Sequence, residues 1–139
     1  MRLKEIMTPD VEVVSPGDTL EDAARKMAEL DVGPLPVCEG RRVVGMLTDR
    51  DITVRATAAG CDPKATLICD AMTQDIICCY EDQDVREAAR LMGEKQIRRL
   101  PILNRANELV GIVSLGDLAT GAGDQVQPSE VLKKVSEPT

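Results

Sequence analysis

One stretch of the sequence decides the fold, and the chain contains it twice: Val44-Gly45-Met46-Leu47-Thr48-Asp49-Arg50-Asp51 and Val110-Gly111-Ile112-Val113-Ser114-Leu115-Gly116-Asp117. Each copy has a glycine, two apolar residues and then Thr/Ser-x-x-Asp. Shorter motifs precede both copies in the same order: Met-Thr-x-Asp, Ala-Ala-Arg-x-Met and Leu-Pro-Val/Ile. A repeat of about 50 to 60 residues buries little surface alone, so we expect two copies packed around a pseudo-twofold axis.

The first copy has the pattern strand, helix, strand, strand, helix. A β-branched run forms the first expected strand, and Thr19 followed by Asp22 resembles a capping box that opens a helix. Gly33-Pro34 ends that helix, and Thr48 begins another one. The expected strands are Val11 to Val14, Leu35 to Cys38 and Arg42 to Leu47. The inward face of the first helix is expected to carry Leu20, Ala23, Ala24, Met27 and Leu30.

The second copy follows the same plan. Its helices are expected to begin at Asp84 and Ser114, and its strands to cover Ile76 to Cys79, Leu100 to Leu103 and Leu109 to Val113. The segment from Ala65 to Ala71 is expected to be a short helical lead-in like Leu3 to Met7. Residues 120 to 128 are expected to be loose and Pro128 to Val135 to form two helical turns. These patterns place the first repeat at 3–59, a linker at 60–65, the second repeat at 66–120 and a polar tail at 121–139.

Composition limits the function. At 139 residues with 43% apolar content, the chain has room for one compact domain and not for a regulatory module plus an ordinary catalytic domain. The net charge of -7 argues against a general affinity for nucleic acid, which is bound through surplus Lys and Arg. No apolar run reaches the length of a membrane span, and residues 1 to 10 contain no export signal. We therefore expect a soluble, cytoplasmic protein without a membrane partner.

The side chains also argue against catalysis and against a metal site. The sequence contains no histidine, and its five cysteines include no C-x-x-C pair. Cys78 and Cys79 fall on an expected buried strand, where packing explains them better than redox sensing does. We expect no enzymatic activity, no required cofactor and no metal ligand.

Two tandem copies of this unit, each ending in Gly-h-h-Thr/Ser-x-x-Asp after a Leu-Pro-Val/Ile strand, resemble the paired CBS domains of the Bateman module. The resemblance covers residues 3 to 120 and implies an α+β fold of two β-α-β-β-α repeats with pseudo-twofold symmetry. It also implies a regulatory module whose clefts between the repeats bind adenosyl compounds such as AMP, ADP, ATP or S-adenosylmethionine. Resembling modules often pair into homodimers and regulate another protein, which the sequence does not identify.

The resemblance assigns Asp51 to the ribose hydroxyls and Thr48 to the phosphate side of the better ligand site, and Arg98 or Arg99 to the phosphate. A planar guanidinium suits that task. The remaining residues implied for this site are Met46, Ile76, Ile77 and Ile97. The second, weaker site would contain Val11, Glu12, Ile112, Ser114 and Asp117. Its counterpart of the arginines is Val32-Gly33-Pro34, and Glu12 would repel phosphate there.

Two other interpretations remain open. Thr/Ser-x-x-Asp is also a helix-capping box that needs no ligand, and the arginines could be a solvated strand edge or ion-pair partners. The competing function is a ligand-free scaffold that dimerises or docks onto a partner protein. An enzyme is the third hypothesis, although no nucleophile or paired carboxylates can be named.

Overall fold

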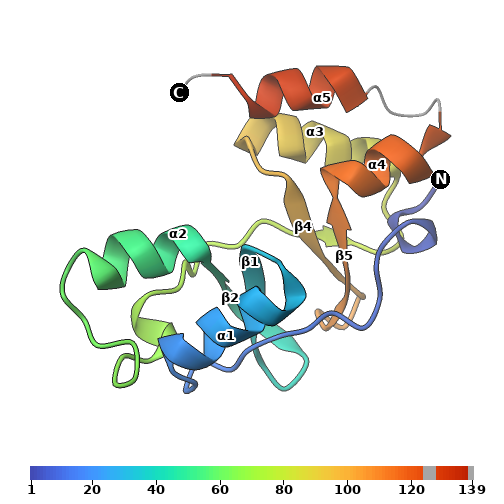
Figure 1. The fold of residues 1–139 in the computed structure, drawn as a ribbon. Coiled ribbons are helices and arrows are strands. Elements are labelled where there is room, and N and C mark those ends of the chain that lie inside the picture. Colours follow the sequence, from blue (N-terminus) through green and yellow to red (C-terminus); the bar gives the residue numbers. More distant parts are fainter. Residues whose placement is uncertain (124–127, 138–139) are drawn as a thin grey trace. The chain divides into compact units, whose positions relative to one another are not determined.

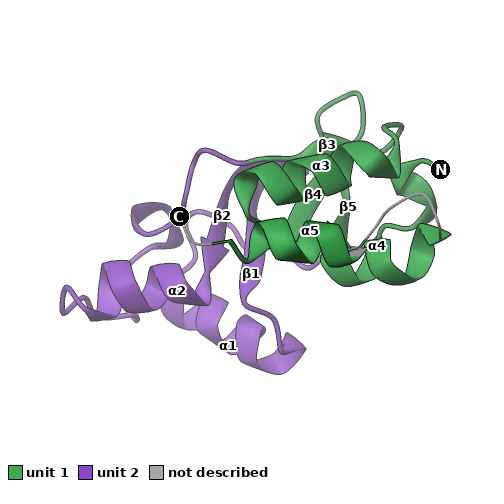
Figure 2. Ribbon diagram, turned by 90° about the horizontal axis from the view of Figure 1, so that it is seen from above, with its two compact units in different colours: residues 1–11, 77–139 green, residues 12–76 purple. Residues whose placement is uncertain are grey.

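The chain folds into two compact units, and the computed structural model describes residues 1–123 and 128–137 (Figure 1). Unit 1 contains Met1–Val11 and Ile77–Thr139, and unit 2 contains Glu12–Ile76 (Figure 2). Both units combine helices with a small sheet, so the fold is the mixed α+β fold that the repeat pattern predicts.

Unit 2 is built on a β-hairpin. Strand β1 (Pro34–Glu39) pairs antiparallel with β2 (Arg42–Thr48), and Gly40 with a φ of 62° makes the turn between them. Helix α1 (Leu20–Leu30) precedes the hairpin, and α2 (Asp49–Asp51) follows it and continues as the π-helix η2 (Ile52–Thr57). The 3-10 helix η3 (Ile68–Asp70) completes the unit.

Unit 1 repeats this plan with one more strand. The short β3 (Cys79–Tyr80) is parallel to β4 (Arg99–Leu103), which pairs antiparallel with β5 (Leu109–Ser114). Its helices are the 3-10 helix η1 (Leu3–Glu5), α3 (Val85–Lys95), α4 (Leu115–Gly121) and α5 (Pro128–Val135).

The two long helices begin where the sequence predicts, and α1 ends at Leu30, shortly before the expected end at Gly33-Pro34. Thr19 and Asp22 form the expected capping box of α1, and the Asp84 carboxylate accepts a hydrogen bond from the amide of Arg86 at the start of α3. Asp31 and Gln96 end the two helices in the left-handed conformation, with φ of 54° and 55°. The matching ends place β1 and β4 at the same point of each repeat.

The leading segments, residues 3–8 and 68–73, are exchanged between the sequence repeats. Each packs in the unit that is built mainly from the other repeat. Thr73 forms two hydrogen bonds with Met46 of β2 at 2.8 and 2.9 Å, and Thr8 forms the same pair with Ile112 of β5 at 2.9 and 3.0 Å. The repeated glycine permits this contact, since a Cβ on Gly45 would lie only 2.9 Å from the Thr73 oxygen. The Met-Thr motif of one repeat therefore docks on the glycine motif of the other.

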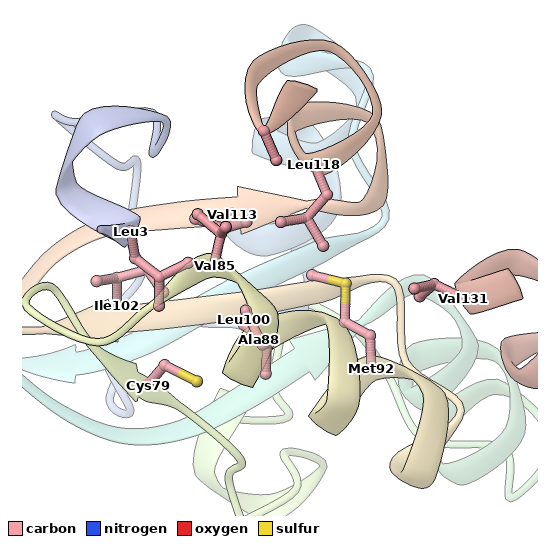
Figure 3. Close-up of a cluster of buried hydrophobic side chains, with 11 residues drawn as sticks. Leu3, Cys79, Val85, Ala88, Met92, Leu100, Ile102, Val113, Leu118 and Val131 are labelled. Atoms are coloured by element: carbon pink, nitrogen blue, oxygen red, sulfur yellow. The ribbon is translucent and has the colours of Figure 1, made fainter. Parts of the chain in front are cut away.

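Each unit has its own apolar core. In unit 1, Leu3 from the leading segment lies with residues of β3, α3, β4, β5 and α4 (Figure 3). In unit 2, Ile68 holds the matching place among residues of α1, β1 and β2. Leu3 and Ile68 are both fully buried, so each leading segment forms part of the core that it enters.

Some sequence predictions are wrong in detail. Val11 to Val14 forms no strand, since only Val14 makes a single parallel bridge to Val37, and the strand expected at Ile76 to Cys79 is reduced to Cys79–Tyr80. Ala24 and Leu30 of α1 are exposed, because Leu30 lies next to the left-handed end of the helix and Ala24 lies beside the buried stripe. The helix expected at Pro128 to Val135 is confirmed as α5. The segment expected to be loose, 120–128, begins inside α4, which ends at Gly121, and its residues 124–127 lie outside the described residues.

Candidate functional site

The Thr/Ser-x-x-Asp motifs form two corners of nearly identical geometry. At the Asp51 corner, the amide of Thr48 donates to Asp51 Oδ2 at 2.9 Å, and the amide of Asp51 donates to Thr48 Oγ1 at 3.0 Å. At the Asp117 corner, the corresponding bonds with Ser114 are 2.8 and 3.0 Å long. Both motifs are therefore complete capping boxes, and one oxygen of each carboxylate is left over for another donor.

Arg55 approaches that remaining oxygen at the Asp51 corner. Its Nε lies 3.8 Å from Asp51 Oδ1, and its Nη1 lies 3.3 Å from the carbonyl oxygen of Met72. Sequence reasoning did not single out this arginine, although its position four residues after Asp51 on a helix could have indicated it. Arg55 thus links the carboxylate to the leading segment that docks in unit 2.

The two corners differ in charge where β1 and β4 begin. The amide of Asp49 donates to the carbonyl of Gly33 at 3.0 Å, and in unit 1 the amide of Leu115 donates to the carbonyl of Arg98 at 2.8 Å. The backbones match, but a glycine and an aspartate in unit 2 are replaced by an arginine and a leucine in unit 1. A Cβ on Gly33 would lie 3.2 Å from Asp49 Oδ1, so the Asp51 corner is closely lined by acidic oxygen. The arginine at the start of the strand is found only at the Asp117 corner of the two.

A pocket with a volume of ≈ 570 Å³ opens at the Asp117 corner, within unit 1. Arg98 precedes β4, and β4, β5 and α4 supply Arg99, Ser114, Leu115, Gly116 and Ala119; α5 supplies Ser129 and Leu132. We call it the arginine pocket. Its volume is in the range of small-molecule sites, and it combines two cations with apolar side chains.

Both arginines are available to an anion. Arg99 pairs with Ser114 at the end of β5, and the carbonyl of Arg98 accepts from the amide of Leu115. Both arginines are exposed, and neither has an ion pair among residues 1–123 and 128–137. The sequence left two structural interpretations of these arginines open, a solvated strand edge and ion pairing. A salt bridge of either arginine is not seen in the described part of the chain. The pocket joins the arginines to Ser114, which the resemblance assigned to a different site.

The other candidate residues lie in both units. Unit 2 contains Met46, half-buried in β2, and half-buried Ile76; unit 1 contains Ile77, Ile97, Val11 and Ile112, all half-buried. Glu12 of unit 2 forms an ion pair with Lys26 at 3.3 Å, which offsets the charge that was expected to repel phosphate. The assignment of these residues to a ligand stays a prediction.

The buried cysteines are poorly suited to redox chemistry. Burial raises the pKa of Cys38 and Cys78, and burial together with Cys78 and Glu87 raises that of Cys79 to about 11. Cys61 and Cys69 are exposed. No group of three metal-ligating side chains gathers among the residues that the structure describes.

The repeats, their shared fold and their matching corners define a tandem pair of one small domain. The CBS domain family matches residues 3–56 and 68–122, and the chain belongs to this family. No helix in the described part of the chain is long and apolar enough to cross a membrane.

Several relatives resemble the chain over most of its length. The CBS domain-containing protein YhcV of Bacillus subtilis is 40% identical over 96% of this chain and 94% of its own. Hypoxic response protein 1 of Mycobacterium tuberculosis is 38% identical over 84% of this chain and 81% of its own. A crystal structure of Hypoxic Response Protein I, with two coordinated zinc ions, has a TM-score of 0.78 with 37% identity and covers 86% of this chain and 97% of that chain.

A further solved structure contains an adenosyl ligand. The crystal structure of CBSX2 in complex with AMP has a TM-score of 0.75 and 27% identity, and covers 87% of this chain and 95% of that chain.

Proposed function

We propose that this chain is a regulatory module that binds an adenosyl ligand and signals its presence to a partner protein. The arginine pocket is the observation that carries the proposal. Two guanidinium groups that are unpaired within the described residues border a small-molecule-sized hollow beside Ser114. The AMP complex of CBSX2 supports an adenosyl compound as the ligand class.

The chemistry of the residues matches the parts of such a ligand. Arg98 and Arg99 would bind the phosphate, because guanidinium forks form paired, charge-assisted hydrogen bonds with phosphate oxygens. The second oxygen of a capped aspartate can accept from the ribose hydroxyls, as an acidic residue does in dinucleotide folds. Asp117, capped by Ser114 of the pocket lining, is the candidate for that role in unit 1, and Asp51 is the matching candidate in unit 2.

The test is AMP binding by calorimetry and thermal shift on the unaltered chain and on R98Q, R99Q, D51A and D117A. A ligand at about 100 times its Kd raises stability by about 2.7 kcal/mol. We expect each arginine variant to lose this shift while remaining folded. R90Q is the matched control, because Arg90 is an exposed arginine of α3 that pairs with Glu87 and Glu94 outside the pocket. Equal AMP affinity in R98Q, R99Q and R90Q would refute the assignment.

The same assay separates the ligand from the scaffold function. Both capping boxes are complete without a ligand, which is the observation that favours a pure interaction scaffold. A scaffold would show no thermal shift with AMP, ADP, ATP, S-adenosylmethionine or NAD. D51A would then cost only a cap-sized ~0.5 to 2 kcal/mol and change no ligand binding.

The proposal includes a homodimer, a cytoplasmic setting and no catalysis. Leu30 of α1 and Val54 of η2 are 43% and 51% exposed and give unit 2 apolar surface for pairing. Light scattering with and without AMP tests the dimer, and a monomer at micromolar concentration would refute it.

Chromatography of nucleotides after incubation tests catalysis, and steady hydrolysis that depends on Asp51 or Asp117 would make the protein an enzyme.

A further inference from the structure

Helix α5 lies beyond the residues that match the family, yet it is built into unit 1. It runs beside α3, and Val131 enters the core with Met92 and Leu118 (Figures 1 and 3). Val131 is only 8% exposed. The helix therefore has a defined docking position.

Two residues of the α3 region fit this docked helix. A Cβ on Gly93 would lie 3.1 Å from Cδ of Lys134, so the glycine makes room for the lysine stem. Gln96, which ends α3, donates from Nε2 to the carbonyl oxygen of Glu137 at 2.7 Å and to that of Lys134 at 3.3 Å. The side chain that follows α3 thus bonds two carbonyl groups at the end of α5.

Another part of α5 faces the arginine pocket. Leu132 is 45% exposed and lines the pocket together with Ser129. Leu115 and Ala119 of α4 add further apolar surface, while Arg98 and Arg99 supply positive charge. A ligand with an anionic group and a less polar body would contact both kinds of surface and cover Leu132.

We propose that α5 is a wall of the ligand pocket, and that docking of α5 and binding of the ligand strengthen each other. The inference rests on the proposed function and adds a ligand-responsive element to it. By linkage, the factor by which the ligand favours the docked helix equals the factor by which docking raises ligand affinity. Val131 and Val135 hold α5 against the core of unit 1, and Gln96 bonds its end. Local undocking of α5 is the second state, and a ligand that contacts only the docked helix would lower its population.

The test combines AMP affinity with hydrogen exchange of α5 in the full chain. We expect AMP to slow exchange of the amides from Leu132 to Ser136. L132A and Q96A should each weaken AMP binding about 5- to 10-fold, within the usual range of coupling between sites. Q96A complements L132A, because Gln96 does not line the pocket and its side chain bonds the end of α5. E130A, at an exposed position of α5 outside the pocket lining, is the control and should bind AMP as the unaltered chain does.

The outcomes separate this inference from the proposed function. If AMP binds but L132A and Q96A keep full affinity and α5 exchange does not change, α5 is no part of the site and the inference is overturned alone. If the unaltered chain binds no AMP, the proposed function and the inference fail together. Should Q96A not fold, L132A still decides, since it removes only a partly exposed side chain.

Discussion

At the scale of single residues, the repeated glycine leaves no room for a Cβ. A Cβ on Gly45 would lie 2.9 Å from the backbone oxygen of Thr73 and 2.7 Å from Sδ of Met72. The methionine can move, but the backbone carbonyl is held by the pairing with Met46. We therefore expect G45A to destabilise the protein by ~1 to 3 kcal/mol, the usual cost of overpacking, as measured by urea unfolding.

Gly17 provides the control for that substitution. Nothing lies within 4 Å of a Cβ built there, so G17A should change the free energy of unfolding by no more than about 1 kcal/mol. Equal effects of G45A and G17A would show that the close contact of the leading segment does not constrain the fold.

Cys79 gives a prediction about pH. Burial raises its pKa to about 11, whereas an unfolded cysteine has a pKa of about 8.5. The folded state thus favours the neutral thiol, and the resulting stability is complete below about pH 8.5 and is lost as the pH rises toward 11. Urea midpoints between pH 8 and 11 should fall more steeply for the unaltered chain than for C79A. Parallel curves would contradict the prediction.

At the scale of elements, the start of α3 depends on an ionised cap. The Asp84 carboxylate accepts from the side chain and the backbone of Arg86, and these bonds hold its pKa well below the usual range. A lowered pKa stabilises the fold above about pH 4, the value in the unfolded chain, and the contribution is lost as the pH falls further. D84N should therefore reduce the drop in urea midpoint between pH 7 and pH 3. The same substitution at exposed Asp75 is the control, and identical changes in both variants would refute the role of Asp84.

The elements also show what the sequence could predict. Helix starts at Thr19, Asp84, Thr48 and Ser114 were predictable, because an N-cap or capping box is a local arrangement of side chain and backbone. The strand expected at Val11 to Val14 failed, because strand formation needs a partner and this segment makes only one bridge. The leading segments also pair outside their own repeats, which no local pattern reveals.

The candidate site was predictable to a similar extent. Repetition and resemblance selected Arg98, Arg99 and Ser114 but placed Ser114 in a different site, whereas the structure gathers all three in one pocket. The contribution of α5 was not predictable, since Leu132 reaches the pocket only because Gly93 and Gln96 dock the helix. Arg55 was missed for the same reason, as its contact to Met72 depends on where the leading segment docks.

At the scale of the whole molecule, the exchange of leading segments makes the repeats interdependent. The amide of Leu3 donates to Gln83 at 2.9 Å in unit 1, and the amide of Ile68 donates to Asp18 at 2.9 Å in unit 2. Each compact unit therefore contains one segment of the other repeat. A sequence repeat expressed alone would lack the core residue that the other repeat supplies, Leu3 or Ile68. Its own apolar leading segment would be exposed, because the unit in which it packs would be missing.

Leu3 and Ile68 test this arrangement as a matched pair. Both side chains are fully buried, so L3A and I68A should each cost ~2 to 5 kcal/mol of unfolding free energy. The exchange predicts where each loss is felt. Hydrogen exchange should accelerate first around α3, β4 and β5 in L3A, although Leu3 belongs to the first repeat in sequence, and around α1, β1 and β2 in I68A. The opposite pattern, with L3A loosening α1, β1 and β2, would show that the leading segments stay with their own repeats in solution. Each sequence repeat would then form a compact unit with its own leading segment.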